Sequence, residues 1–355
     1  MREPISLHSA EVLASCERLM RTGSHSFFAA SRILPQRFKH AATAVYAFCR
    51  VADDAVDELP PGASIEIVMD YLRERLDAIY CGEPFLIDAD IAFAAVVHEY
   101  AIPKAIPTAL LEGFQWDASS REYETLEALY DYATRVAGTV GAMMTLIMGG
   151  RSAQTIARAC ELGVAMQLTN IARDVGEDAG RGRIYLPLQW MREEGIDPNE
   201  LLRRPQHSAA LARVVARLLR VADQLYVRAE TGIASLPRDC RPAIMSARLI
   251  YADIGRVIRQ RDCDAVGQRA VVGKPRKWWL MGRALISLLL APPKDYLLQP
   301  LAAVRFLVAA APVGERDAVQ PDLLISTIGL LERLGHRSRS RCSQTPEGAE
   351  GKGAA

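Results

Sequence analysis

Paired cysteines and long apolar runs are both missing from this chain of 355 residues. Its seven cysteines are scattered without a CxxC pair, and their odd number and wide spacing argue against a disulfide framework or a zinc site. The most apolar stretches, between Trp278 and Val313, are interrupted by arginines and prolines and fall short of the roughly 18–20 apolar residues of a membrane-spanning helix. No run typical of a signal peptide follows Met1. We therefore expect a cytoplasmic protein with reduced thiols.

The sequence also has few strand signals and a small net charge. The formal net charge is +1, which gives no global field to attract nucleic acid. Hydrophobic residues make up 50% of the chain and can fill a sizeable core. Long stretches rich in Ala, Leu, Arg and Glu have helical periodicity, which predicts an all-α protein. The expected helices cover roughly residues 8–22, 38–57, 64–80, 88–100, 105–116, 125–148, 152–178, 207–234, 239–265 and 276–290.

A polar stripe occurs within an otherwise apolar segment, residues 46–58. Tyr46, Arg50, Asp53 and Asp57 follow one another at intervals of 4, 3 and 4 residues, so they share one face of a helix. The residues between them are mainly Ala, Val and Phe, which predicts a helix buried on most sides. Carboxylates at i and i+4 repel each other, and burying them unpaired costs several kcal/mol. A cationic group must therefore face this stripe.

A second stripe has the same character. Gln167, Asn170, Asp174 and Asp178 are separated by 3, 4 and 4 residues, and they follow a mostly apolar stretch that begins at Ala159. One DxxxD pattern is common on solvated helix faces. Two of them, each on an apolar helix and each accompanied by an arginine, are a much more specific signal and indicate one shared site.

The side-chain chemistry indicates which cation fits. No histidine lies beside either stripe and no cysteine has ligand spacing, so the oxygen-only set excludes zinc and suits a hard ion such as Mg²⁺. Mg²⁺ usually takes one or two carboxylates and completes its octahedron with water and substrate phosphates. We expect the aspartates of the two stripes to hold a diphosphate through Mg²⁺. The arginines expected to neutralise that diphosphate are Arg50, Arg173, Arg181 and Arg183, with surface salt bridges as the alternative for the last two.

These stripes belong to a longer series of motifs. In chain order the series is Ser26-Phe27, Tyr46-Ala-Phe-Cys-Arg50, Asp53-Asp54-Ala-Val-Asp57, Tyr132 before Val136-Ala-Gly-Thr-Val-Gly141, Gln167-Leu-Thr-Asn170-Ile-Ala-Arg173-Asp174-Val-Gly-Glu-Asp178, and Arg183-Ile-Tyr-Leu-Pro187. Their order and spacing from about residue 20 to 270 resemble the squalene/phytoene synthase family. The family often reads Ser-Lys-Ser-Phe at the first motif. His25 replaces that lysine here, which leaves Ser26 as the better candidate for a diphosphate contact.

The resemblance implies a fold, a reaction and a cofactor. The fold is an isoprenoid-synthase-type helical bundle, a single domain around a central cavity. The reaction is the head-to-head (1′–1) condensation of two geranylgeranyl diphosphates to phytoene through a cyclopropylcarbinyl diphosphate, catalysed by a prenyltransferase of carotenoid biosynthesis with Mg²⁺ or Mn²⁺. Squalene or dehydrosqualene formation from farnesyl diphosphate is the alternative. NADPH is not expected, because phytoene formation ends by proton loss rather than hydride transfer.

The resemblance also implies roles for individual residues. A carbocation formed in the cavity must be kept from water, which calls for apolar or aromatic walls. Asn170 joins Asp53, Asp57, Asp174 and Asp178 as a metal ligand, Tyr46 and Tyr132 join the catalytic group, and Ser26, Phe27, Gln167 and Tyr251 join the substrate-binding group. The aromatic side chains would stabilise the cation through their π faces, with core packing as the alternative. Small residues near Ser31 and Thr43 are expected to make room for a C20 tail, with close helix packing as the alternative.

Outside the site, we expect a synthase domain over residues 1–300, a helical extension over 301–336 and a disordered tail over 337–355. The apolar substrates, together with Trp278-Trp279 and the apolar residues after them, predict peripheral contact with the inner membrane surface, with core packing as the alternative. Downstream carotenoid enzymes are further expected partners.

Three rival classes fit the pattern less well. A chain-elongating prenyl diphosphate synthase normally carries two DDxxD-type clusters, and a terpene cyclase pairs its acidic motif with an Asn/Ser/Glu triad. A non-catalytic helical scaffold would have no reason to keep four facing carboxylates.

Overall fold

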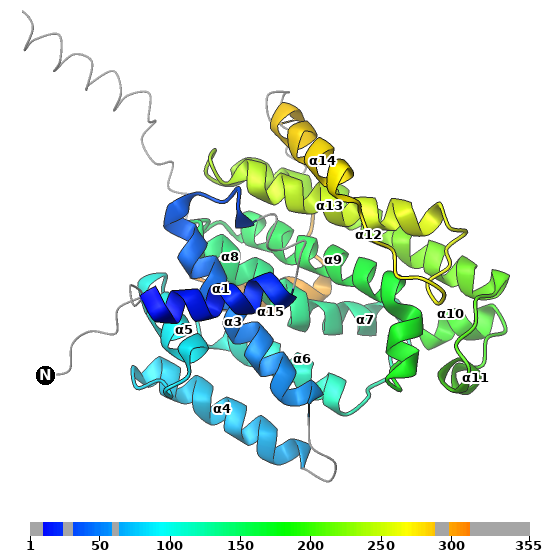
Figure 1. Cartoon of the computed structure of the whole chain (residues 1–355), viewed down its shortest axis with the longest axis horizontal. Coiled ribbons are helices and arrows are strands. Elements are labelled where there is room, and N and C mark those ends of the chain that lie inside the picture. Colours follow the sequence, from blue (N-terminus) through cyan, green and yellow to red (C-terminus); the bar gives the residue numbers. More distant parts are fainter. Residues whose placement is uncertain (1–9, 24–30, 59–63, 288–297, 313–355) are drawn as a thin grey trace, which may run out of the picture. The chain divides into compact units, whose positions relative to one another are not determined.

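The computed structural model describes residues 10–23, 31–58, 64–287 and 298–312, and every regular element in them is a helix (Figure 1). The elements are α1 (Ala10–Gly23), α3 (Gln36–Asp57), α4 (Ile65–Cys81), α5 (Asp88–Glu99), α6 (Ala105–Ala118), α7 (Leu126–Ala133), the π-helix η1 (Thr134–Gly138), α8 (Thr139–Ile147), α9 (Ala153–Gly180), α10 (Leu188–Glu193), α11 (Pro198–Arg203), α12 (Ala209–Ser235), α13 (Arg241–Arg259), α14 (Lys274–Ser287), the 3₁₀-helix η2 (Ala302–Val304) and α15 (Arg305–Ala310). The all-α prediction is confirmed.

The helix boundaries differ from the expected ones in three places. The helix expected over 125–148 contains η1, a π-helical stretch of a kind that often occurs at functional sites. The helix expected over 239–265 ends at Arg259, because the chain turns at Asp262 and Cys263, whose φ angles are 52° and 54°. The short helices α10 and α11 lie where the sequence pattern predicts none.

Helix α9 is the central element of the bundle. It packs against α12, α8, η1, α13 and α15. Buried side chains occur along most of its length, from Thr155 to Ala179, which is the pattern of a helix surrounded by others. Its N-terminus is capped by Ser152, whose hydroxyl accepts a hydrogen bond from the amide of Thr155.

Two glycines bring η1 and α8 very close to α9. A Cβ atom on Gly141 would lie 2.3 Å from the carbonyl oxygen of Ala159, and one on Gly163 would lie 2.3 Å from that of Ala137. Both distances are below the 3.0 Å that real Cβ atoms respect, so any larger residue would push the helices apart.

The described part of the C-terminal segment packs onto this bundle. Helix α15 contacts α9, α6 and α8, and Val304 and Leu307 are fully buried. These residues belong to a compact unit that spans Met1–Asp317. The domain division at residue 300 stays a prediction, and most of the expected extension and the whole 337–355 tail lie outside the described residues. None of the described helices combines the length and apolarity needed to cross a bilayer.

Candidate active site

A cavity of about 300 Å³ lies between α3, η1, α8, α9, α12 and α13. Its walls are mainly apolar, with side chains such as Val140, Met144, Leu162, Met166, Ile233 and Ile244. Of the expected site residues, Tyr46, Gln167, Asn170 and Tyr251 line it. Such a lining suits a hydrocarbon chain with a polar group at one end.

The α3 wall of the cavity refines one expectation. Ala42, Tyr46 and Cys49 line the cavity at i, i+4 and i+7. Thr43 is buried but is not among these lining residues, so the small residue that borders the cavity here is its neighbour Ala42. One residue along a helix turns the side chain by about 100°, which is enough to move Thr43 off this face. Ser31 does line the cavity, as expected.

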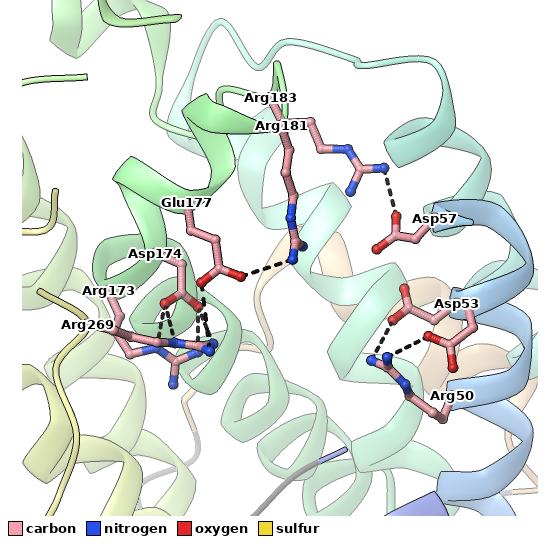
Figure 2. Close-up of polar contacts among 10 residues, drawn as sticks. Arg50, Asp53, Asp57, Arg173, Asp174, Glu177, Arg181, Arg183 and Arg269 are labelled. Carbon is pink, nitrogen blue, oxygen red and sulfur yellow. Dashed lines mark hydrogen bonds and ion pairs between the residues drawn. The ribbon is translucent and has the colours of Figure 1, made fainter. Parts of the chain in front are cut away.

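The acidic stripes lie one helical turn beyond the cavity walls. Asp53 follows Cys49 by four residues on α3, and Asp174 follows Asn170 by four on α9. Figure 2 shows the two groups of side chains facing each other from the two helices. The predicted convergence of the stripes is therefore present, at one end of the apolar cavity.

The α3 group is short of positive charge. The Arg50 guanidinium contacts Asp54 closely, at 2.6 Å, and lies farther from Asp53, at 3.6 Å. Asp57 accepts a hydrogen bond of 2.8 Å from Arg183 (Figure 2). Burial, followed by repulsion from Asp57, raises the pKa of Asp53 to about 7.

Helix α9 is kinked at Asp174, within its acidic group. Asp174 has non-helical angles (φ −106°, ψ 16°), and two arginines, Arg173 and Arg269, donate to its carboxylate at 2.5–3.1 Å (Figure 2). Just beyond it, the amide of Gly176 donates to the carbonyl oxygen of Ala265. A Cβ on Gly176 would lie 2.8 Å from the backbone of the next residue in that loop, so only glycine allows this approach.

The last turn of α9 carries the other uncompensated carboxylate. Burial, followed by repulsion from Asp174, raises the pKa of Asp178 to about 7. Arg181 does not pair with it but with Glu177, at 3.0 Å. Arg181 therefore forms a surface salt bridge, the alternative considered from the sequence. Arg183 instead pairs with Asp57 of α3.

These carboxylates fit a hard divalent cation as two facing pairs. In the described part of the chain, no three His, Cys, Asp or Glu side chains converge tightly enough to hold an ion by themselves. The raised pKa values of Asp53 and Asp178 mark buried carboxylates whose charge the nearby arginines offset only in part, and their oxygen donors suit Mg²⁺ or Mn²⁺. Each pair could supply one or two ligands, with the remainder coming from diphosphate and water.

The sequence interpretation missed Asp117, on α6. Its two carboxylate oxygens accept hydrogen bonds from Tyr132 (2.9 Å) and Tyr185 (2.6 Å), and burial raises its pKa to about 6. It lies close enough to Asp53 to raise the pKa of that carboxyl as well. Tyr132 is thus held beside the acidic groups and is not among the cavity-lining residues, so its catalytic role stays a prediction. The only sequence signal for Asp117 was an acid in an apolar helix.

At its opposite end the cavity borders a buried charged cluster through the side chain of Arg158. The side chains of Arg158 and Glu161 are fully buried, and Arg228 donates to both oxygens of Glu161. The Nη1 atom of Arg158 lies 2.7 Å from Glu161 at an angle unsuited to a hydrogen bond, so charge holds this pair. Backbone atoms of residues 298–301 complete the cluster, because the carbonyls of Leu298 and Gln299 accept from the two arginines and the Leu301 amide donates to Glu161. We call this cluster the cavity floor.

The floor lies far from the acidic end. Arg158 lines the cavity and precedes Asp174 by 16 residues on α9, or about 24 Å at ~1.5 Å per residue. Ser26 and Phe27, the remaining expected site residues, lie outside the described residues.

Comparison with known proteins identifies the family. The sequence pattern of the squalene/phytoene synthase family matches residues 20–276. The chain belongs to this family. A phytoene synthase of Rhodobacter capsulatus is 47% identical over 322 residues, which cover 89% of this chain and 95% of the relative. A phytoene synthase of Cereibacter sphaeroides is 46% identical, covering 92% and 98%.

A solved structure of the family agrees with the fold. The crystal structure of a dehydrosqualene synthase in complex with ligand superimposes with a TM-score of 0.72 at 31% identity, covering 78% of this chain and 96% of that one. The isoprenoid-synthase-type helical fold is therefore confirmed. Family membership also excludes the chain-elongating and cyclase classes considered from the sequence.

Proposed function

We propose that this protein is a prenyltransferase that condenses two geranylgeranyl diphosphates head to head to phytoene, with release of diphosphate. The observation that carries the proposal is the pair of facing carboxylate groups at one end of an apolar cavity, in a chain 46–47% identical to two bacterial phytoene synthases. Condensation of farnesyl diphosphate is the second candidate, favoured by the likeness to a dehydrosqualene synthase.

The residues at the acidic end would promote loss of the diphosphate. Bound Mg²⁺ or Mn²⁺ would supply Lewis-acid stabilisation of the leaving group. Asp53, Asp57, Asp174 and Asp178 would hold the metal, with Asn170 as a further oxygen ligand on the cavity wall. Arg183 and Arg50, now paired with carboxylates, are placed to exchange those partners for phosphate oxygens.

The cavity would protect the cation left behind. Its apolar wall excludes water, which would otherwise quench an allylic cation. Tyr46 and Tyr251 lie on that wall, where their rings can stabilise positive charge. Burial raises the pKa of Tyr46 to about 12, which keeps its hydroxyl neutral. A proton lost in the last step ends the reaction without NADPH.

Product analysis tests the proposal directly. Purified protein is incubated with geranylgeranyl or farnesyl diphosphate, Mg²⁺ or Mn²⁺, and with or without NADPH, and the extracted hydrocarbons are identified by mass spectrometry. We expect a C40 product from geranylgeranyl diphosphate that needs metal but not NADPH. A C30 product alone would support the second candidate, and no condensation product from either substrate would contradict both.

Metal binding is expected to be detectable without turnover. Mg²⁺ together with inorganic pyrophosphate should raise the melting temperature by at least ~3 °C, because ligands that bind only the folded state stabilise it by mass action. Asp53→Asn/Asp174→Asn should lose most of this shift. Pyrophosphate without metal and Mg²⁺ alone are the controls. An equal shift in the double variant would contradict the ligand assignment.

Substrate length is expected to respond to bulk at Ser31. This side chain lines the cavity, and one isoprene unit extends about as far as one helical turn, ~5 Å. Ser31→Phe should therefore shift the ratio of kcat/KM values at least ~10-fold toward farnesyl diphosphate and a C30 product. The matched control is Thr43→Val, which changes a buried residue off the cavity wall. Unchanged selectivity in folded Ser31→Phe would contradict the prediction.

A further inference from the structure

The outward face of α14 is unusually apolar. Trp278 and Trp279 are 68% and 53% exposed, and Leu285 and Ile286 are 55% and 61% exposed. These four residues are two pairs seven residues apart, so they form one stripe along two turns of the helix. Gly282, between the pairs, is also exposed, and a Cβ there would meet nothing within 4 Å.

The inward face of α14 is already occupied. Leu280 and Ala284 are buried, and the helix packs on α13 (Figure 1). Arg276 donates to Asp253 of α13 at 2.8 Å and stacks on the ring of Trp279 at 4.2 Å. The helix thus packs on α13 through Leu280 and Ala284, and its four large hydrophobic side chains are exposed to solvent. Core packing, the alternative considered for Trp278 and Trp279, does not occur within the described residues.

Charge on α14 is of one sign. Its sequence, KPRKWWLMGRALIS, contains two lysines and two arginines and no acid. Lys274 and Arg283 are exposed at the borders of the apolar stripe, and neither has an ion-pair partner among the described residues. Exposed tryptophans bordered by cations are typical of helices that lie in the interface of an anionic bilayer.

We propose that the outward face of α14 docks this protein onto an anionic lipid bilayer, with the Trp278–Trp279 and Leu285–Ile286 pairs inserted among the acyl chains and Lys274 and Arg283 at the phosphates. A second copy of the chain fits this face less well. A two-fold contact through this face would bring together two helices that each carry four cations and no acid, so their charges would repel each other. Each cation near an anionic leaflet gains attraction instead.

The docked helix lies one layer from the cavity. Helix α13, on which α14 packs, contributes Ala243, Ile244, Ala247 and Tyr251 to the cavity wall. A bilayer bound at α14 would therefore be separated from the cavity by the thickness of one helix. This arrangement would bring the site for long hydrocarbon chains close to a reservoir that dissolves them.

Vesicle binding without substrate tests this inference independently of the reaction. The full-length protein is mixed with vesicles of phosphatidylcholine or of phosphatidylcholine and phosphatidylglycerol, and the bound fraction is measured by flotation. We expect binding to the anionic vesicles that falls at least ~10-fold in Trp278→Ser/Trp279→Ser and in Leu285→Ser/Ile286→Ser. Lys274→Gln/Arg283→Gln should weaken binding to the anionic vesicles selectively.

The matched control is Ile67→Ser/Leu86→Ser, which removes two apolar side chains that are 70% and 97% exposed on other parts of the surface. It should bind like the wild type, and all variants should keep the wild-type melting temperature. The proposal is overturned if the wild type does not bind, if the Trp278→Ser/Trp279→Ser variant binds equally well, or if that variant instead converts an oligomer to monomers in size-exclusion chromatography. Loss of binding in the control would likewise overturn it.

Discussion

Replacing Asp53 or Asp174 with alanine is expected to lower kcat at least ~100-fold, the scale typical of losing a preorganised charge contact. The two carboxylates lie on α3 and α9 and face each other across the end of the cavity where a diphosphate would bind (Figure 2). Asp57→Ala and Asp178→Ala should have effects of the same order. The measurement is the rate of condensation at saturating substrate and metal.

The stability of each variant separates this effect from misfolding. Asp53→Ala removes a carboxylate whose pKa is raised by burial and by Asp57, so the melting temperature should stay equal or rise. Asp77→Ala is the matched control, because it removes an exposed carboxylate that pairs with Lys104 on the surface. Near-wild-type rates in both Asp53→Ala and Asp174→Ala, with metal still required, would contradict the assignment of the site.

A second large effect is expected at the cavity floor. Glu161→Ala should lower the free energy of unfolding by about 3–5 kcal/mol, because removing one partner of a buried ion pair leaves the other charge uncompensated. Arg158 would remain fully buried without an anion, and the Leu301 amide would lose its acceptor. Urea denaturation measures the change, and faster amide exchange at residue 301 should accompany it.

An exposed ion pair provides the control for this prediction. Glu194 pairs with Arg213 at 2.7 Å on the surface, and Glu194→Ala should change stability by no more than about 1 kcal/mol. Similar losses in Glu161→Ala and Glu194→Ala would show that the buried cluster does not hold the floor together.

Helical spacing accounts for what could be predicted from the sequence. The 3.6-residue period located the long helices, and the intervals of three and four residues placed Asp53 with Asp57 and Asp174 with Asp178 on single faces. The same period placed Thr43 on the face of Tyr46, whereas the cavity is lined by the preceding residue, Ala42. Helices α10 and α11 have six residues each, too few for a periodic signal.

The missed residues have partners that no local pattern connects. Asp117 is bonded to Tyr185, 68 residues away, and Arg269 to Asp174, 95 residues away. Neither Asp117 nor Arg269 belongs to a repeated spacing, so only the tertiary arrangement reveals them. The buried cluster of Arg158 and Glu161 likewise depends on a backbone segment 140 residues further along the chain.

The cavity floor has a consequence for how this enzyme can be shortened. The family pattern ends at residue 276, yet Leu298 and Leu301 are bound to the floor and Leu307 is fully buried. A fragment cut where the sequence similarity ends would keep every acidic residue of the site and lose the backbone atoms that bind Arg158, Arg228 and Glu161. We expect such a fragment to be less stable than the full chain, because the buried charges would lose these partners and the packing of Val304, Leu307 and Ala311 would be missing. The segment that resembles the family thus ends before the segment that the packed fold includes.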